Sequence, residues 1–337
     1  MTTLQRRFRL ILAGIVGLMG CGREAERPPA TPIPAPATEA QVTSPAPTRP
    51  ASWPMEVIDG FGRKVVIARP PLRVVSLAPS NTEILFAVGA ADIVVGRTTV
   101  CSYPPEAAAV AAVGGMTPKT INLEALVALQ PDLVLTTCGV QEPLIAPLDR
   151  LSLPVVALDA DDFEGVARNI RLVGSLTSHA EAGDQLATRF RARVEAVRKR
   201  VAVRTVPRPR VLYLVGEDPL MTAGPQTFIG RMIETAGGIN VFDDTTMRYP
   251  RPSEEEILAR APEIIMTAVG AMSAGRGDEA ARRGRIAGRP GWSQIPAVRD
   301  QRIELLVEDQ VLRPGPRLAD GLEAVANALE PRRPGSR

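Results

Sequence analysis

Short apolar runs alternate with amphipathic patterns along most of the chain. In the first half, four runs rich in β-branched residues are almost continuously apolar, as expected of parallel strands covered on both faces. They are residues 73–78, 93–96, 132–137 and 154–159. Three more runs follow at residues 210–215, 263–268 and 302–306. Helical patterns separate them, so the alternation predicts α/β lobes.

One long helix is predicted between the two sets of strands. From about residue 181 to 203, apolar residues recur at three- and four-residue steps while arginines fall largely on other faces. The apolar positions are Leu186, Phe190, Val194, Val197 and Val201. Pro207 and Pro209 end this pattern before the next strand begins. Two similar lobes joined by a helical strut are the simplest interpretation.

An internal repeat indicates that the two lobes are built alike. Residues 122–137 align with residues 253–268 without a gap. In each block an N-cap residue opens a helix, a proline ends it, and an acidic residue leads into a buried strand. Each block also carries a glutamate two residues after the cap, Glu124 or Glu255. This duplicated acidic corner suits docking, although the helix macrodipole also favours acids at these positions.

Another helix start follows the first strand. Ser80 and Glu83 have the spacing of a capping box, and an apolar run to Val88 follows, with Gly89 behind it. We therefore interpret Glu83 as a structural residue that completes the box.

The two ends of the chain lack the alternating pattern. Positively charged residues before a short apolar stretch have the layout of a secretory signal, and residues 18–21 resemble a bacterial lipobox. We expect a signal peptide at residues 1–20, a lipid on Cys21, a Pro-rich tether to residue 54, and a frayed tail at residues 331–337. A plain signal peptide with a chance cysteine is the alternative.

Composition fits this division and excludes several classes of protein. The 337 residues are 45% hydrophobic, enough to bury a sizeable core in two lobes at residues 55–180 and 207–330, bridged by a helix at residues 181–206. Net charge is only +3, and no basic stripe with interleaved aromatics marks a nucleic-acid groove.

Enzymatic and metal-binding motifs are missing from the sequence. It contains no phosphate-binding P-loop, no Gly-x-Ser-x-Gly elbow and no His-Glu-x-x-His motif. His179 is the only histidine and has no Cys or Ser nucleophile near it in sequence. We therefore expect no catalysis, no metal site and no cofactor.

Several ordered motifs resemble one known family. Residues 73–83, 102–105, 122–124, 130–134 and 258–262 together are similar to the periplasmic binding proteins for vitamin B12 and ferric siderophores, especially the vitamin B12-binding branch. The resemblance covers about residues 57–329. It implies a class III periplasmic binding protein, in which two Rossmann-like lobes bridged by a rigid helix hold a ligand between them with little closure.

The same resemblance implies partners and a location. Glu124 and Glu255 match the glutamates that engage arginines on the membrane permease subunits of an ABC importer. The protein would be a monomer, exported to the periplasm or cell surface and held at the membrane by its lipid.

Candidate ligand residues lie at the carboxyl ends of the predicted strands, where open α/β sheets bind ligands. In the first lobe they are Pro79, Ser80, Asn81, Cys101, Tyr103, Cys138 and Gly139. In the second lobe they are Tyr249 and Asp309, which match an aromatic residue and an aspartate of the vitamin B12 binders. Tyr103, which precedes two prolines, is equally well explained as a packing aromatic.

The resemblance implies cobalamin or a related corrinoid as ligand, because aromatic faces suit a large, flat macrocycle. Val100 and Val215 stand where the vitamin B12 binders carry aromatic residues, which keeps a ferric siderophore or haem open as the alternative. A non-transport envelope lipoprotein is more distant, because it explains the anchor and tether but not the duplicated lobes.

Cys101 and Cys138 are both predicted at strand ends on the same edge, in an exported protein. Export permits a disulfide between them. Such a bond requires the two Cα atoms to lie about 4.4–6.8 Å apart, which sequence spacing cannot establish.

Overall fold

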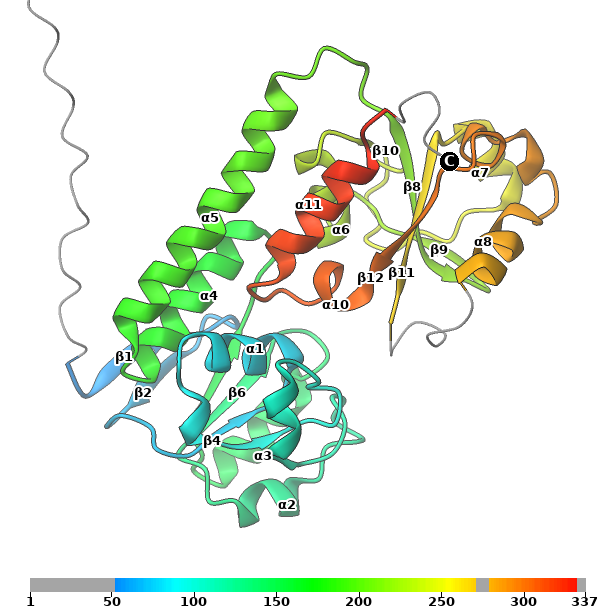
Figure 1. Ribbon diagram of the computed structural model, residues 1–337. Helices are drawn as coiled ribbons and strands as arrows, with labels where there is room; N and C mark the ends of the chain where they lie inside the picture. The colour runs from blue at the N-terminus through cyan, green and yellow to red at the C-terminus, as the bar shows by residue number, and fades with distance from the viewer. Residues whose placement is uncertain (1–51, 271–278, 332–337) are drawn as a thin grey trace, which may run out of the picture. The chain divides into compact units, whose positions relative to one another are not determined.

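Each half of the folded chain is built around one sheet of mainly parallel strands (Figure 1). The computed structural model describes residues 52–270 and 279–331, all within one structural unit, Thr48–Arg337. The predicted signal peptide, Cys21, the tether up to residue 51 and the tail from residue 332 lie outside the described residues.

The first sheet has the order β5-β4-β3-β6-β7. Its strands are β3 (Val74–Ser76), β4 (Val94–Arg97), β5 (Ala111–Ala112), β6 (Leu133–Thr137) and β7 (Val155–Leu158). Ahead of it, β1 (Met55–Ile58) and β2 (Lys64–Ile67) form an antiparallel hairpin that the sequence did not predict.

The second sheet has the order β10-β8-β11-β12, with β9 antiparallel on β8. Its strands are β8 (Arg210–Glu217), β9 (Leu220–Thr222), β10 (Ile239–Asn240), β11 (Ile264–Val269) and β12 (Ile303–Val307). Numbered within each lobe, β4-β3-β6-β7 and β10-β8-β11-β12 both follow the order 2-1-3-4, and all these pairs are parallel. The two lobes therefore share one doubly wound topology.

Helices cover both faces of each sheet. The first lobe has α1 (Pro79–Ala87), α2 (Leu123–Ala128), α3 (Ile145–Arg150) and α4 (Phe163–Leu176), and α5 (Ala180–Ala202) follows. The second has α6 (Phe228–Thr235), α7 (Glu254–Arg260), α8 (Glu279–Ala287), α9 (Pro296–Arg299), α10 (Glu308–Val311) and α11 (Leu318–Ala328). Short 3-10 turns are η1 (Ala91–Ile93), η2 (Pro105–Ala109), η3 (Glu142–Leu144) and η4 (Trp292–Gln294).

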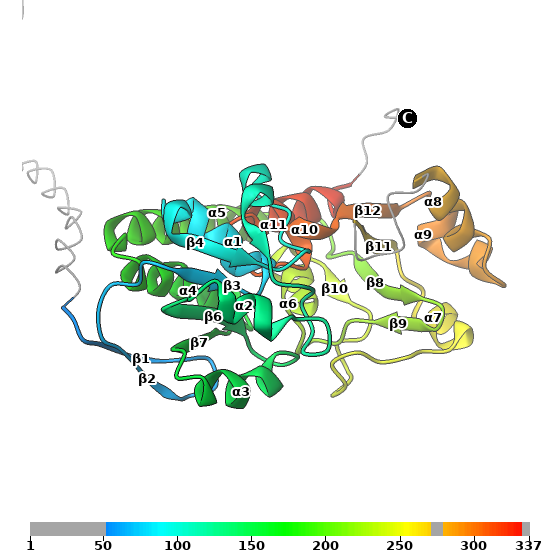
Figure 2. The same ribbon diagram turned by 90° about the horizontal axis from the view of Figure 1, so that it is seen from below.

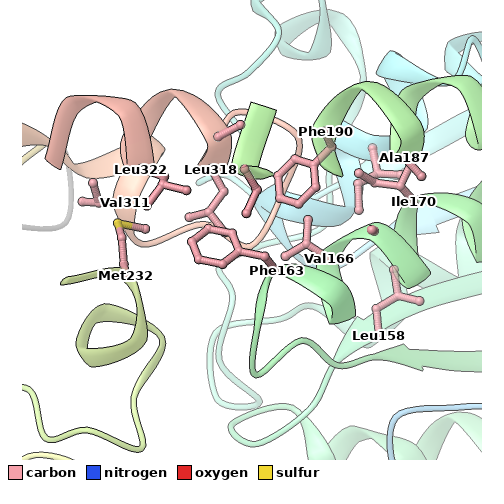
Figure 3. Packing of buried hydrophobic residues seen from close by; sticks show 14 of the residues in the cluster. Leu158, Phe163, Val166, Ile170, Ala187, Phe190, Met232, Val311, Leu318 and Leu322 are labelled. Carbon is pink, nitrogen blue, oxygen red and sulfur yellow. The ribbon is translucent and has the colours of Figure 1, made fainter. Parts of the chain in front are cut away.

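The long helix α5 packs against elements of both lobes. It lies along α4 of the first lobe and also contacts α6 and α11 of the second (Figure 1). One hydrophobic cluster accordingly runs from the first sheet through α4 and α5 to α6, α11 and the second sheet (Figure 3). Phe163 of α4 joins the parts, with ring centroids 6.3 Å from Phe190 of α5 and 5.1 Å from Phe228 of α6. The lobes are thus coupled by a shared helical layer.

The opposite face of each sheet has its own smaller core. In the first lobe, Val75 and Val134 pack with Leu126 of α2 and Leu148 of α3. Figure 1 shows α2 apart from α4 and α5 in this lobe, and Figure 2 shows α3 apart from them. The second lobe repeats the arrangement with α7, α8 and α9. Successive strand residues alternate between the two cores, because a strand points its side chains to opposite faces.

Two glycines allow α4 and α5 to approach closely. A Cβ atom placed on Gly174 would lie 2.9 Å from the Cα atom of Gly183, and one on Gly183 would lie 3.1 Å from the Cα atom of Gly174. The two helices therefore touch backbone to backbone at this point.

The seven predicted strands and the long helix are confirmed, with boundaries shifted by at most two residues. The capping-box interpretation is wrong. Helix α1 begins at Pro79, whose ring fixes φ at a helical value, and its N-cap residue Ala78 has no side-chain cap. Glu83 instead makes a long-range contact described below.

Candidate functional site

The carboxyl ends of the two sheets contact each other at one side through a buried polar cluster. Glu83 of α1 is only 2% exposed. Its Oε1 accepts a hydrogen bond from the backbone N–H of Arg317 at 2.8 Å, and its Oε2 accepts one from Arg317 Nε at 2.9 Å. Burial raises the pKa of Glu83, while the hydrogen bonds and charge of Arg317 act in the opposite direction. A charged pair from both lobes therefore lies in a largely water-excluded position.

Further residues of the loop after β4 and of α10 complete this polar cluster. The Arg317 guanidinium carbon lies 3.5 Å from the centroid of the Tyr103 ring. Arg313 Nη2 is 2.7 Å from Asp309 Oδ1, and Arg313 Nη1 donates to Ser102 Oγ at 3.2 Å. The predicted ligand residues Tyr103 and Asp309, 206 positions apart in sequence, thus belong to one cluster across the lobes.

A second contact between the lobes lies after β7. Arg248, in the loop that follows β10, is 3.6 Å from Asp161, and Arg231 of α6 is 4.0 Å from Asp162. These pairs are largely exposed, so each contributes little. In each contact, the segment after the fourth strand of one lobe thus meets a residue after the second strand of the other, Tyr103 in the first contact and Arg248 in the second.

The predicted residues that follow β3 are committed to internal contacts. Ser80 and Asn81 are buried within the first turn of α1, beside buried Pro79. Asn81 Nδ2 donates to the carbonyl oxygen of Thr136 at 2.9 Å and so ties α1 to the end of β6. Their place at the strand ends is as predicted, but their side chains support the loop rather than extend from it.

The two cysteines of the folded region are free thiols, so the disulfide that export would permit between them is not formed in this structure. Cys101 is buried, and its Sγ lies 3.0 Å from Thr98 Oγ1. Cys138 follows β6, where burial and then the nearby charge of Asp159 raise the pKa of its thiol to about 12. Gly139, with φ of +79°, turns the chain directly after it.

Tyr249 lies in the loop between β10 and α7 and is 46% exposed. The loop and α7 enclose an open cavity of about 610 Å³, which Tyr249 lines together with Met247, Pro250 and Arg260. Arg260 is fixed by Asp244 and Glu256 and lies 4.2 Å above the Phe242 ring. The sequence placed Tyr249 at a strand end but gave no sign of this cavity.

Glu124 and Glu255 occupy equivalent, exposed positions at the starts of α2 and α7. The predicted N-caps are confirmed, because Asn122 Oδ1 accepts from Ala125 N–H at 3.0 Å and Ser253 Oγ accepts from Glu256 N–H at 3.1 Å. Hydrogen bonds from its own backbone and from Ser253 lower the pKa of Glu255. No ion pair joins either glutamate to another described residue.

Arg313, Arg317 and Arg248 are contact residues that sequence reasoning missed. Arg313 and Arg317 flank Pro314, Gly315 and Pro316 in the short stretch between α10 and α11. Their partners in the first lobe are 211 to 234 positions away, so no local pattern could have identified these contacts.

Neither a membrane-spanning helix nor a metal site is found in residues 52–270 and 279–331. No helix there combines the length and hydrophobicity needed to cross a bilayer. No group of three or more His, Cys, Asp or Glu residues there could hold a metal ion.

Comparison with known proteins gives consistent matches. A family model described as periplasmic binding protein matches residues 74–309. YvrC of Bacillus subtilis, named an uncharacterized ABC transporter substrate-binding lipoprotein, is 29% identical over 328 residues, covering 96% of this chain and 95% of YvrC.

Solved structures show the same fold. The periplasmic vitamin B12 binding protein BtuF of Vibrio cholerae is 29% identical with a TM-score of 0.65, and the match covers 77% of this chain and 97% of BtuF. The periplasmic heme-binding protein BhuT, solved with two hemes, is 28% identical with a TM-score of 0.68, covering 77% and 99% of the two chains. The fold is that of a class III periplasmic binding protein with two Rossmann-like lobes, as predicted.

Proposed function

Because the chain belongs to the periplasmic binding protein family, whose members are non-enzymatic transport components, we propose that it captures cobalamin or a related corrinoid between its lobes for an ABC importer. In this proposal it delivers the ligand to the membrane permease. The more general role, substrate binding for an importer of vitamin B12, haem or siderophores, follows from the family and its relatives.

The contact between the strand ends of the two lobes carries the proposal. The two lobes have the same strand order, and their carboxyl-end segments meet at two places, around Arg317 and around Arg248. Open α/β sheets bind ligands at this edge. Tyr103 and Tyr249 remain 39% and 46% exposed beside these contacts, so both rings can offer apolar surface to a flat ligand.

Haem or a ferric siderophore is the alternative ligand class. BhuT is as similar to this chain as the vitamin B12 binder from Vibrio cholerae. Val100 and Val215 provide no aromatic face where the vitamin B12 binders do, which leaves fewer ring contacts for a corrinoid. The cobalamin assignment rests on Tyr103, Tyr249 and Asp309.

Permease docking is assigned to Glu124 and Glu255. Both are exposed, both stand one residue inside an N-capped helix, and neither forms an ion pair with another residue of the described chain. A carboxylate that forms no internal ion pair can accept a bidentate arginine from another protein. Two such corners, one on each lobe, would fix the orientation of the receptor on the permease.

Export and anchoring complete the proposal. The lipobox-like residues 18–21 and the Pro-rich tether would hold a monomeric receptor near the membrane while leaving its lobes free to reach the permease. The lipoprotein name of YvrC supports this assignment.

Calorimetry with the Cys21→Ser chain beginning at residue 21 tests the ligand. The panel is cyanocobalamin, cobinamide, haem and several ferric siderophores. We expect one-to-one binding of cyanocobalamin or cobinamide. Tight binding of only haem or a siderophore would overturn the corrinoid assignment and leave the transport role intact. Binding of none would favour the non-transport envelope lipoprotein.

A further inference from the structure

We infer that Arg317 is a positioning residue, whose guanidinium holds the Tyr103 ring in the orientation that contacts the ligand. Glu83, which belongs to the same lobe as Tyr103, holds Arg317 in place. The inference rests on the proposed ligand site and goes beyond it, because Arg317 belongs to the opposite lobe and acts through Tyr103. The geometry that supports it involves three side chains and one backbone N–H group.

The Arg317 guanidinium stacks on the tyrosine ring. Its carbon lies 3.5 Å from the ring centroid, well inside the distance of about 6 Å at which a cation attracts an aromatic face. Tyr103 nevertheless keeps 39% of its surface exposed. One part of the ring is therefore held by the arginine while another part remains accessible.

Arg317 itself has little freedom. Glu83 binds both its backbone N–H and its Nε, so the carboxylate fixes the start of the side chain and the guanidinium at once. Asp309 Oδ2 lies 3.9 Å from the Nη2 of Arg317, too far for a hydrogen bond. A Cβ atom on Gly315 would lie 3.3 Å from the Glu83 carboxyl, so the turn before Arg317 packs directly on this acid.

The unused hydrogen-bonding capacity of Arg317 supports a stacking role. Its Nη2 is buried and has no hydrogen-bond partner. A guanidinium that served only to join the lobes would gain from an acceptor there, because a buried donor without a partner is costly. The orientation seen instead places the planar group over the ring, which lysine could not reproduce.

A purely structural link between the lobes is the competing explanation, and a double-mutant cycle separates the two. The four proteins are the wild type, Arg317→Met, Tyr103→Ala and the double variant, and the readout is the dissociation constant for cyanocobalamin. We expect Arg317→Met to weaken binding by about 3- to 30-fold, the range of a cation–π contact, and to have no further effect in the Tyr103→Ala background. Equal losses in both backgrounds would overturn the inference.

Arg171→Met is the matched control, because Arg171 of α4 also pairs with an acid, Asp184 of α5, but lies outside the contacts between the strand ends. It should leave the dissociation constant unchanged. If Arg317→Met does not fold, Glu83→Gln with Arg317→Met removes both buried charges and replaces it in the cycle.

Fluorine NMR of fluorotyrosine-labelled protein gives a readout without ligand. The chain has three tyrosines, so Tyr→Phe variants assign every resonance. Arg317→Met should shift the Tyr103 resonance and Arg171→Met should not; an unmoved Tyr103 resonance in Arg317→Met overturns the inference. A wild-type chain that binds neither cyanocobalamin nor cobinamide would overturn the proposed ligand, and the fluorine spectrum would still decide whether Arg317 fixes the ring.

Discussion

The acidic corners of the two lobes are equivalent in backbone but different in their surroundings. In the first lobe, Glu124 lies between Leu123 and Ala125 at the start of α2. In the second lobe, Glu255 lies between two other glutamates at the start of α7. The N-cap geometry is nevertheless the same.

The neighbours of Glu255 are both occupied by internal partners. Glu254 pairs with Arg289 at 3.0 Å and also accepts from the indole N–H of Trp292, while Glu256 pairs with Arg260 at 3.0 Å. Only the middle glutamate has no ion pair within the described chain. The comparison shows that the second lobe uses Glu254 and Glu256 for its own packing. It leaves Glu255, at the position that Glu124 occupies in the first lobe, without an ion pair.

Reversing both corner charges should have the largest effect. We expect Glu124→Arg with Glu255→Arg to abolish ligand uptake by cells while leaving ligand affinity unchanged, because arginines on the permease would then be repelled. Asp92→Arg with Glu234→Arg is the matched control, since these exposed acids lie ahead of the equivalent strands β4 and β10. Normal uptake by the corner variant would contradict the docking assignment.

Weakening the helical layer that the lobes share should destabilise both together. Phe190 is 3% exposed and packs between the lobes on α5, so Phe190→Ala should lower the free energy of unfolding by about 3–5 kcal/mol. Urea denaturation measures the change, and the exposed neighbour Arg189→Ala should remain within about 0.5 kcal/mol of wild type. Two separate transitions in the Phe190→Ala protein would show that the lobes unfold independently.

Removing the caps compares the corners directly. Asn122→Ala and Ser253→Ala each delete one hydrogen bond to a helix N–H and should each cost about 1 kcal/mol. The glycine variants at the same positions should cost only a few tenths. Thermal and urea denaturation check both pairs. A large cost at one corner alone would mean that the two helix starts are not equivalent.

The smallest effect is a pH dependence at the junction of the lobes. Burial raises the pKa of Glu83 above its ordinary value of 4.5, so the folded protein keeps this proton to higher pH than the unfolded chain does. The stabilisation that results is fully present below pH 4.5 and is lost as the pH rises through the pKa of Glu83 in the folded protein.

The Glu83→Gln variant cannot titrate at this position. Comparing it with wild type therefore shows whether the titration of Glu83 raises or lowers the stability of the folded protein as pH rises. We expect the free energy of unfolding of wild type minus that of Glu83→Gln to fall as pH rises from below 4.5 and then to level off. Denaturation curves over a pH series provide the measurement, with Glu234→Gln, an exposed acid of α6, as control. A difference that grows with pH would mean that Arg317 outweighs burial.

The sequence predicted most of the strands and the long helix because local patterns along the chain determine these elements. Continuous apolar runs identified the seven longest parallel strands, and the repeat identified both caps. The short strands β5 and β10, with two residues each, are too brief to leave a pattern. The β1–β2 hairpin was missed because its apolar residues fall in the stretch that follows the Pro-rich tether.

The sequence predicted where residues of the candidate site lie in the fold, but not which residues they contact. Strand ends located Tyr103, Cys138 and Asp309 correctly at the carboxyl edges. The partner of Glu83 lies 234 positions away, so the local capping-box spacing gave a plausible but wrong assignment. Whether Cys101 and Cys138 could bond depended on their positions in space, which spacing along the chain does not determine.

Helix α11 follows the other described elements in sequence, which affects the order in which the protein can fold. Leu322 and Val325 of this last helix lie in the same core as Phe190, and α11 packs against both α5 and α6. A growing chain that stops before residue 318 therefore leaves the apolar sides of two helices uncovered. Such a partial chain would be a target for chaperones and proteases until α11 is made.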